Sequence, residues 1–137
     1  MSVALDTGVK LVRNVGRYNI GAGSLAELQP LLASRRAAAR AAGQGSGVVF
    51  LVDEFFRGDA GLPARLGLQP GDALQFVETA DEPKTDGIDA VVADLHARGL
   101  ARPAALVGLG GGITMDTAKS VSNLLTNGGR AADYQGW

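Results

Sequence analysis

Two continuous apolar runs constrain the fold more than any other feature of this sequence. They are residues 48–52 and 104–109, and neither is interrupted by a polar side chain. A strand with one solvated face alternates apolar and polar residues, whereas a strand covered on both faces does not. The two runs therefore predict buried strands of a parallel sheet. Further strands are predicted at residues 73–77 and 9–15.

Helical patterns separate these strands, at residues 25–42, 59–67, 86–98 and 114–126. Ser24 and Glu27 have the spacing of a capping box at the start of the first helix. Asp86 is expected to cap the third helix, and Gly99 to follow its C-terminus. Strands that alternate with helices give an α/β fold, a parallel sheet with helices on both faces.

Composition excludes several classes of protein. The 137 residues suit one domain, and the formal net charge of −1 argues against duplex nucleic-acid and polybasic membrane-surface binders. The absence of Cys and the single His exclude disulfide scaffolds, cysteine nucleophiles and a multi-histidine metal site built from this chain alone. No run approaches the length of a bilayer span and no targeting segment is evident, which favours a cytoplasmic location.

A glycine loop joins the last predicted strand to the last predicted helix. Gly110, Gly111 and Gly112 stand together between them. Glycines let backbone amides converge on one point, and a helix N-terminus adds unpaired donors and about half a positive charge. This arrangement favours a phosphate or pyrophosphate site beyond the carboxyl end of the strand. The alternative is a tight turn without a ligand, which does not need a third glycine.

Charged and polar side chains lie at positions that suit the same site. Asp53 ends a predicted buried strand, where an acid can accept hydrogen bonds from ribose hydroxyls; the alternative is a solvated acid. Asp116, Lys119 and Asn123 share one face of the last helix. They form either a polar wall of a nucleotide site or an ordinary surface pair.

Other nucleotide motifs fit less well. The Gly-Lys-Ser/Thr of a P-loop is absent, and the G-x-G-x-x-G spacing counted from Gly108 meets Ile113 at its last position. Gly21, Gly23 and Ala26 fit the looser G-x-G-x-x-A spacing, but they are interpreted as the start of a helix.

The glycine loop and the helix after it resemble the signature of the iron-containing (group III) alcohol dehydrogenases. The matching residues are Gly110-Gly111-Gly112-x-x-x-Asp116-x-Ala118-Lys119. Residues 18–25, 52–53 and 82–85 are similar to further segments of that family, so the resemblance extends over nearly the whole chain. Residues 122–127 and 133–137 are similar to the subgroup of 3-deoxy-manno-octulosonate 8-oxidases. The related dehydroquinate synthases share the same Rossmann-like wiring of the N-terminal domain but match the loop helix less well.

The resemblance implies that residues 1–137 are a dinucleotide-binding domain. It assigns the pyrophosphate to Gly110, Gly111 and Gly112, with Thr114 also among the cofactor-binding residues. It assigns the adenosine ribose to Asp53, and the nicotinamide side of the cleft to Asp116 and Lys119. An acid at the ribose predicts NAD as the cofactor in preference to NADP. Ile113 departs from the Ser that the family usually has, which removes one hydroxyl near the phosphates.

The family's metal, Fe²⁺ or Zn²⁺, is held by a C-terminal helical domain that this chain does not include. No catalytic or metal-binding residue is therefore assigned, and His96 is expected to be an ordinary partly exposed side chain at a helix end. The two aromatic residues at 134 and 137 suggest that more protein follows. The expected activity is hydride transfer between NAD(P) and an alcohol, aldehyde or sugar-acid hydroxyl, with a homodimer as the assembly, although the chain alone is expected to bind dinucleotide without turnover. The alternative is a non-catalytic nucleotide-binding or assembly module.

Overall fold

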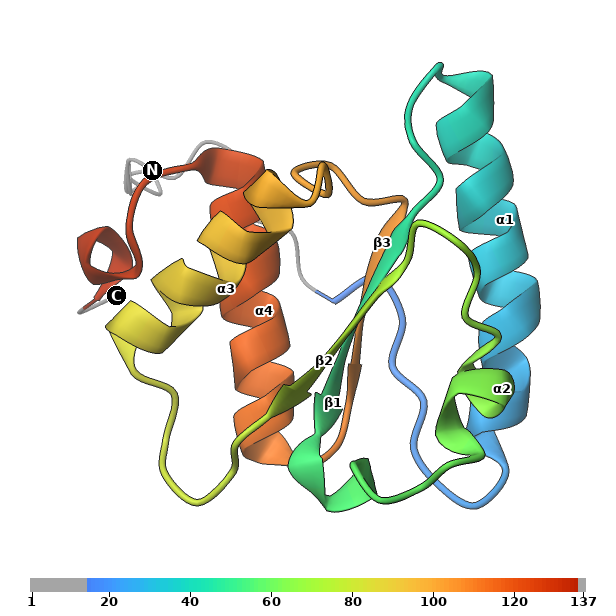
Figure 1. Cartoon of the computed structure of the whole chain (residues 1–137), viewed down its shortest axis with the longest axis horizontal. Coiled ribbons are helices and arrows are strands. Elements are labelled where there is room, and N and C mark those ends of the chain that lie inside the picture. Colours follow the sequence, from blue (N-terminus) through green and yellow to red (C-terminus); the bar gives the residue numbers. More distant parts are fainter. Residues whose placement is uncertain (1–14, 136–137) are drawn as a thin grey trace, which may run out of the picture.

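A three-stranded parallel sheet forms the centre of the molecule. The computed structural model describes residues 15–135. Strand β1 (Val48–Asp53) lies between β2 (Ala73–Val77) and β3 (Ala105–Leu109), in the order β2-β1-β3 (Figure 1). The predicted strands at residues 48–52, 73–77 and 104–109 are confirmed. The strand predicted at residues 9–15 falls, apart from Val15, outside the described residues.

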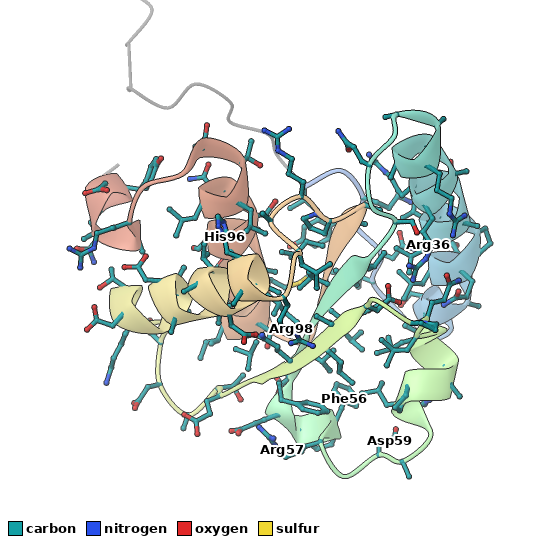
Figure 2. All side chains as sticks on the ribbon, turned by 45° about the horizontal axis from the view of Figure 1, so that its top comes forward. Arg36, Phe56, Arg57, Asp59, His96 and Arg98 are labelled. Carbon is teal, nitrogen blue, oxygen red and sulfur yellow. The ribbon has the colours of Figure 1, made fainter. Side chains whose placement is uncertain are left out.

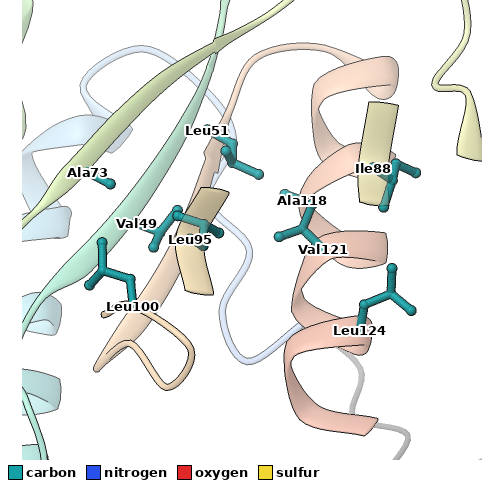
Figure 3. Packing of buried hydrophobic residues seen from close by; sticks show 9 residues of the cluster. All are labelled: Val49, Leu51, Ala73, Ile88, Leu95, Leu100, Ala118, Val121 and Leu124. Atoms are coloured by element: carbon teal, nitrogen blue, oxygen red, sulfur yellow. The ribbon is translucent and has the colours of Figure 1, made fainter. Parts of the chain in front are cut away.

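Helices cover both faces of the sheet, as the continuous apolar runs predict. Helices α1 and α2 lie on one side and α3 and α4 on the other (Figure 1). Successive side chains of β1 point to opposite faces, so that Val49 and Leu51 pack with α3 and α4 (Figure 3). Val48, Phe50 and Val52 pack against the opposite layer. All five of these side chains are buried, which explains why β1 has no polar alternation.

The first helix begins later than the leucine pattern predicts. A 3-10 turn covers Ser24–Glu27, and α1 follows at Leu28–Ala41. Proline has no amide hydrogen and is tolerated in the first turn of a helix, where amides have no intrahelical partner. Because α1 begins at Leu28, Pro30 falls in that first turn. A regular helix beginning at residue 25 would instead place Pro30 where an amide is needed.

The capping box predicted at Ser24 and Glu27 is wrong. The turn begins after Gly23, whose φ of 79° is left-handed, and no side chain of the described residues caps it. Glu27 instead accepts hydrogen bonds from the side chains of Arg17 and Asn19, each at 3.0 Å. The carboxylate therefore connects the turn to the preceding segment.

The third helix also begins at a different residue from the predicted cap. Helix α3 covers Thr85–Ala97, and its N-cap is Lys84 in an extended conformation. Asp86 lies in the first turn, where its negative charge still suits the positive end of the helix dipole, but it makes no capping hydrogen bond. Gly99 is confirmed as the residue after the helix end, with a left-handed φ of 74°.

The remaining helices complete the two layers. Helix α2 is short, at Leu62–Leu66, and α4 covers Gly112–Asn127. Two 3-10 turns, η2 at Glu54–Phe56 and η3 at Ala131–Tyr134, follow β1 and α4. None of the described helices is long and apolar enough to cross a membrane. Tyr134 is half-buried against the α3–α4 layer, and its hydroxyl donates to the Gly128 carbonyl at 2.8 Å.

A buried ion pair connects α1 to the ends of the strands where the chain enters the sheet. Both Arg36 guanidinium nitrogens donate to the Asp72 carboxylate at 2.7 Å, and the two side chains are 4% and 1% exposed (Figure 2 labels Arg36). Asp72 also accepts from the amides of Val48 and Gln69, and Arg36 donates to the Ser46 carbonyl. Burial raises the pKa of Asp72, but these hydrogen bonds outweigh it, so the pKa lies below the ordinary 3.8.

Candidate functional site

The order of the strands brings the predicted site residues Asp53 and Gly110 together. Asp53 is the last residue of β1, and Gly110 directly follows β3, the neighbouring strand. The register pairs Val52 with Leu109, so the segments that follow β1 and β3 leave the sheet side by side. A Cβ built on Gly110 would lie 2.8 Å from the Asp53 Cβ, which shows how closely they approach.

Gly110 is required by the fold itself. Its φ of +154° is rare for residues with a side chain, and a Cβ would also lie 2.8 Å from the Thr114 hydroxyl oxygen. Gly111 and Gly112 are different, because a Cβ at either would meet nothing within 4 Å and neither has a positive φ. A tight turn without a ligand therefore explains the first glycine of the loop but not the other two.

Helix α4 begins at this loop with free backbone donors. Gly111 is the N-cap, and the first intrahelical bond runs from the Met115 amide to the Gly111 carbonyl at 3.0 Å. The amides of Gly112, Ile113 and Thr114 precede that bond, and no side chain of the described residues caps them. A 16-residue helix thus directs its positive end at the open side of the loop.

The Asp53 carboxylate is held in place at the same edge. Its Oδ1 accepts hydrogen bonds from the Phe55 amide at 2.9 Å and from the Thr79 hydroxyl at 3.4 Å. Asp53 is half-buried, whereas Phe55 beside it is 83% exposed. Oδ2 accepts no bond from the part of the chain that the structure describes, so this oxygen is available to an external donor.

Thr79 was not identified from the sequence. It lies two residues after β2, the strand on the other side of β1, and the register pairs Asp53 with Val77. A polar residue just past the carboxyl end of a neighbouring parallel strand is the signal that could have indicated it.

Asp116 and Lys119 lie on the outer face of the first two turns of α4. They form an ion pair at 3.5 Å, with side chains 70% and 49% exposed. Asn123, on the same face, accepts from the Asn127 amide at 2.7 Å. The predicted common face is therefore present, but no hydrogen bond among the described residues connects it to the glycine loop or to Asp53.

Comparison with protein families decides where this arrangement belongs. The model of the family described as iron-containing alcohol dehydrogenase matches residues 16–137. The chain belongs to the iron-containing alcohol dehydrogenase family. This confirms the family inferred from the glycine signature, and the parallel α/β fold agrees with the N-terminal domain of the family. Membership makes the protein an alcohol dehydrogenase-type oxidoreductase, in a family that generally uses NAD(P) and iron.

The described residues of this member of the iron-containing alcohol dehydrogenase family do not include a set of iron ligands. No group of three or more His, Cys, Asp or Glu side chains is gathered there as a metal would require. The single His of the sequence, His96, is exposed near the end of α3 (Figure 2). The described residues therefore do not fit an iron site, and no chemical step through iron is assigned to them.

Two surface hollows of this family member lie away from the glycine loop. One is lined by residues of α3 and of the segment after α4, namely Asp86, Asp89, Val92, Ala93, His96, Gly129 and Arg130. The other is lined by residues before and within η1, namely Tyr18, Asn19, Ile20, Ala22, Gly23, Ser24 and Glu27. Neither hollow includes Asp53 or residues 110–112, so neither supports the candidate site.

Proposed function

We propose that this chain is the dinucleotide-binding half of a metal-dependent alcohol dehydrogenase and that it binds NAD at the glycine loop. The observation that carries the proposal is the open space beside Gly111 and Gly112 at the N-terminus of α4. The fold does not need glycine at these two positions, and the neighbouring amides have no intrahelical partner. A ligand that approaches the backbone closely explains both observations best.

The pyrophosphate is the part of NAD that suits this loop. Its negative charge is favoured by the positive end of α4, and its oxygens accept from the amides of Gly112 and Ile113. The third amide without an intrahelical partner is that of Thr114, because the intrahelical bonds begin at Met115. Side chains at Gly111 or Gly112 would occupy the space that the phosphates need.

The adenosine ribose is proposed to lie against Asp53. Oδ1 is held by Phe55 and Thr79, which leaves Oδ2 to accept from the ribose hydroxyls. A negative carboxylate there repels the additional phosphate of NADP, so NAD is the proposed cofactor. The exposed ring of Phe55 offers an aromatic face beside the ribose for the base.

The proposed reaction is hydride transfer between NAD and an alcohol, an aldehyde or a sugar-acid hydroxyl. Bound NAD would supply the hydride acceptor, and Asp116 and Lys119 would border its nicotinamide side. The Fe²⁺ or Zn²⁺ of the complete enzyme would be held by a helical domain outside this chain. The sugar-acid subgroup, the homodimer and the cytoplasmic location stay predictions.

Calorimetric titration with NAD⁺ tests the proposal, with loop variants as the internal comparison. Gly111→Ala and Gly112→Ala place a methyl group in open space, so both variants should fold normally. Each methyl group would keep a phosphate away from the loop amides, so NAD⁺ binding should weaken by about tenfold or more, comparable to the loss of one charge-assisted hydrogen bond. Gly87→Ala is the matched control, because its methyl also meets nothing, on a different helix.

Two results would count against the proposal. One is the absence of heat at millimolar NAD⁺ on a folded sample. The other is an equal affinity of the wild type and both loop variants.

A further inference from the structure

The hydroxyl of Thr114 has no hydrogen-bond partner although it is completely buried. Thr114 is 0% exposed, and its Oγ1 is the one buried side-chain polar atom without a partner in the part of the chain that the structure describes. A buried hydroxyl left unpaired destabilises a protein by about 1–3 kcal/mol. Such a group in a folded protein calls for an explanation.

The geometry of α4 explains why this hydroxyl is left unpaired. Two other threonines of the helix donate to the carbonyl four residues earlier, Thr117 to Ile113 at 2.8 Å and Thr126 to Ser122 at 2.9 Å. For Thr114 the equivalent residue is Gly110, which lies before the helix at a φ of +154°. Gly110 is thus outside the regular helix, and the Thr114 hydroxyl makes no hydrogen bond to its carbonyl.

The orphaned hydroxyl lies at the glycine loop. A Cβ on Gly110 would approach the Thr114 hydroxyl oxygen to 2.8 Å, so this hydroxyl lies directly beside the backbone of the first glycine of the loop. The other side chains of the first turn of α4, Ile113 and Met115, have no hydrogen-bond donor. Thr114 is thus the residue of the first turn of α4 whose side chain could donate a hydrogen bond to a phosphate at the loop.

We propose that the Thr114 hydroxyl donates a hydrogen bond to a phosphate oxygen of the bound dinucleotide, with the backbone at Gly110 yielding to admit it. This inference rests on the proposed function. The free protein carries the cost of the unpaired hydroxyl, and the ligand supplies the missing acceptor. Thr114 is therefore a specificity residue for phosphate whose hydroxyl lowers the stability of the empty protein.

Replacing Thr114 by its isostere separates affinity from stability. Thr114→Val keeps the shape of the side chain and removes the hydroxyl. We expect this variant to bind NAD⁺ and ADP about tenfold more weakly. Its melting temperature without ligand should be equal to or above that of the wild type, because an unsatisfied buried group has been removed.

Two further variants make the comparison specific. Thr114→Ser retains the hydroxyl and should retain most of the affinity, although the lost methyl group lowers the melting temperature. Thr117→Val removes a buried hydroxyl that already has its acceptor on the same helix. It should leave the affinity for NAD⁺ unchanged and should not raise the melting temperature.

The outcomes distinguish this inference from the proposed function. If the wild type binds NAD⁺ and Thr114→Val binds it equally well, the inference is wrong while the proposed function stands. A lower melting temperature of unliganded Thr114→Val would show that the hydroxyl has an internal partner, and this also overturns the inference. If the folded wild type binds neither NAD⁺ nor ADP, both are wrong.

Discussion

Gly110 is the loop residue that the fold cannot replace. An alanine there would adopt a backbone conformation that L-residues rarely take, and its methyl would press on Asp53 and Thr114 at 2.8 Å. We expect Gly110→Ala to lower the free energy of unfolding by about 1–3 kcal/mol from overpacking alone. Urea denaturation would measure it. Gly87→Ala should be neutral or stabilising, since it lies in open space on α3.

An unchanged urea midpoint for Gly110→Ala would contradict this account of Gly110. It would mean that Asp53 and Thr114 make room for an added methyl group at little cost in stability.

Asp53 should decide between the two nicotinamide cofactors. Asp53→Asn retains an oxygen that can accept from the Phe55 amide at the start of η2, while the negative charge is lost. We therefore expect little change in stability, weaker binding of NAD⁺ and stronger binding of NADP⁺, because the repulsion of the added phosphate disappears. Parallel calorimetric titrations with the two cofactors would measure this shift. Equal preference in the wild type would contradict the proposed role.

At the scale of elements, the Arg36–Asp72 pair holds α1 against the loops that precede β1 and β2. Removing one partner of such a buried pair costs about 3–5 kcal/mol, because the other charge stays buried. Asp72→Asn should therefore reduce the urea midpoint strongly. Asp116→Asn is the matched control for stability, since it removes one partner of an exposed pair that contributes at most about 1 kcal/mol.

The same pair predicts how stability depends on pH. The pKa of Asp72 is lower in the folded protein than its ordinary value of 3.8, so the folded state favours the charged form. This stabilisation is fully present above 3.8 and is lost as pH falls through the lower pKa of the folded state. Urea denaturation midpoints measured at decreasing pH should therefore decrease over that pH range. The midpoint of Asp72→Asn should decrease less steeply with pH, and an identical slope in the two proteins would contradict this account.

For the whole molecule, we expect metal ions to have little effect. The chain has one His and no Cys, and its described residues gather no metal-ligating cluster. Added Fe²⁺ or Zn²⁺ should therefore leave both the melting temperature and the affinity for NAD⁺ unchanged. A saturable rise in melting temperature, abolished by His96→Ala, would show that this chain binds metal and would contradict the assignment of the metal to another domain.

Local patterns in the sequence predict the positions of the site residues but not what each residue does. The loop at residues 110–112 and the carboxylate of Asp53 were both identified from what surrounds them in sequence, a buried run that ends and a helix that begins. The separate functions of the three glycines could not be identified in this way. That Gly110 is required by packing, while Gly111 and Gly112 face open space, depends on which side chains the sheet brings beside them.

The α/β class, the three described strands, the family and the location of the glycine loop follow from the amino-acid sequence, because each depends on patterns within a few neighbouring residues. The folded arrangement was needed to show that Thr79 supports Asp53, that Arg36 pairs with Asp72 and that the Thr114 hydroxyl has no partner. These contacts join residues of different elements, or depend on the conformation of Gly110 at one loop. Strand order and backbone geometry, which no local pattern encodes, determine which polar groups meet.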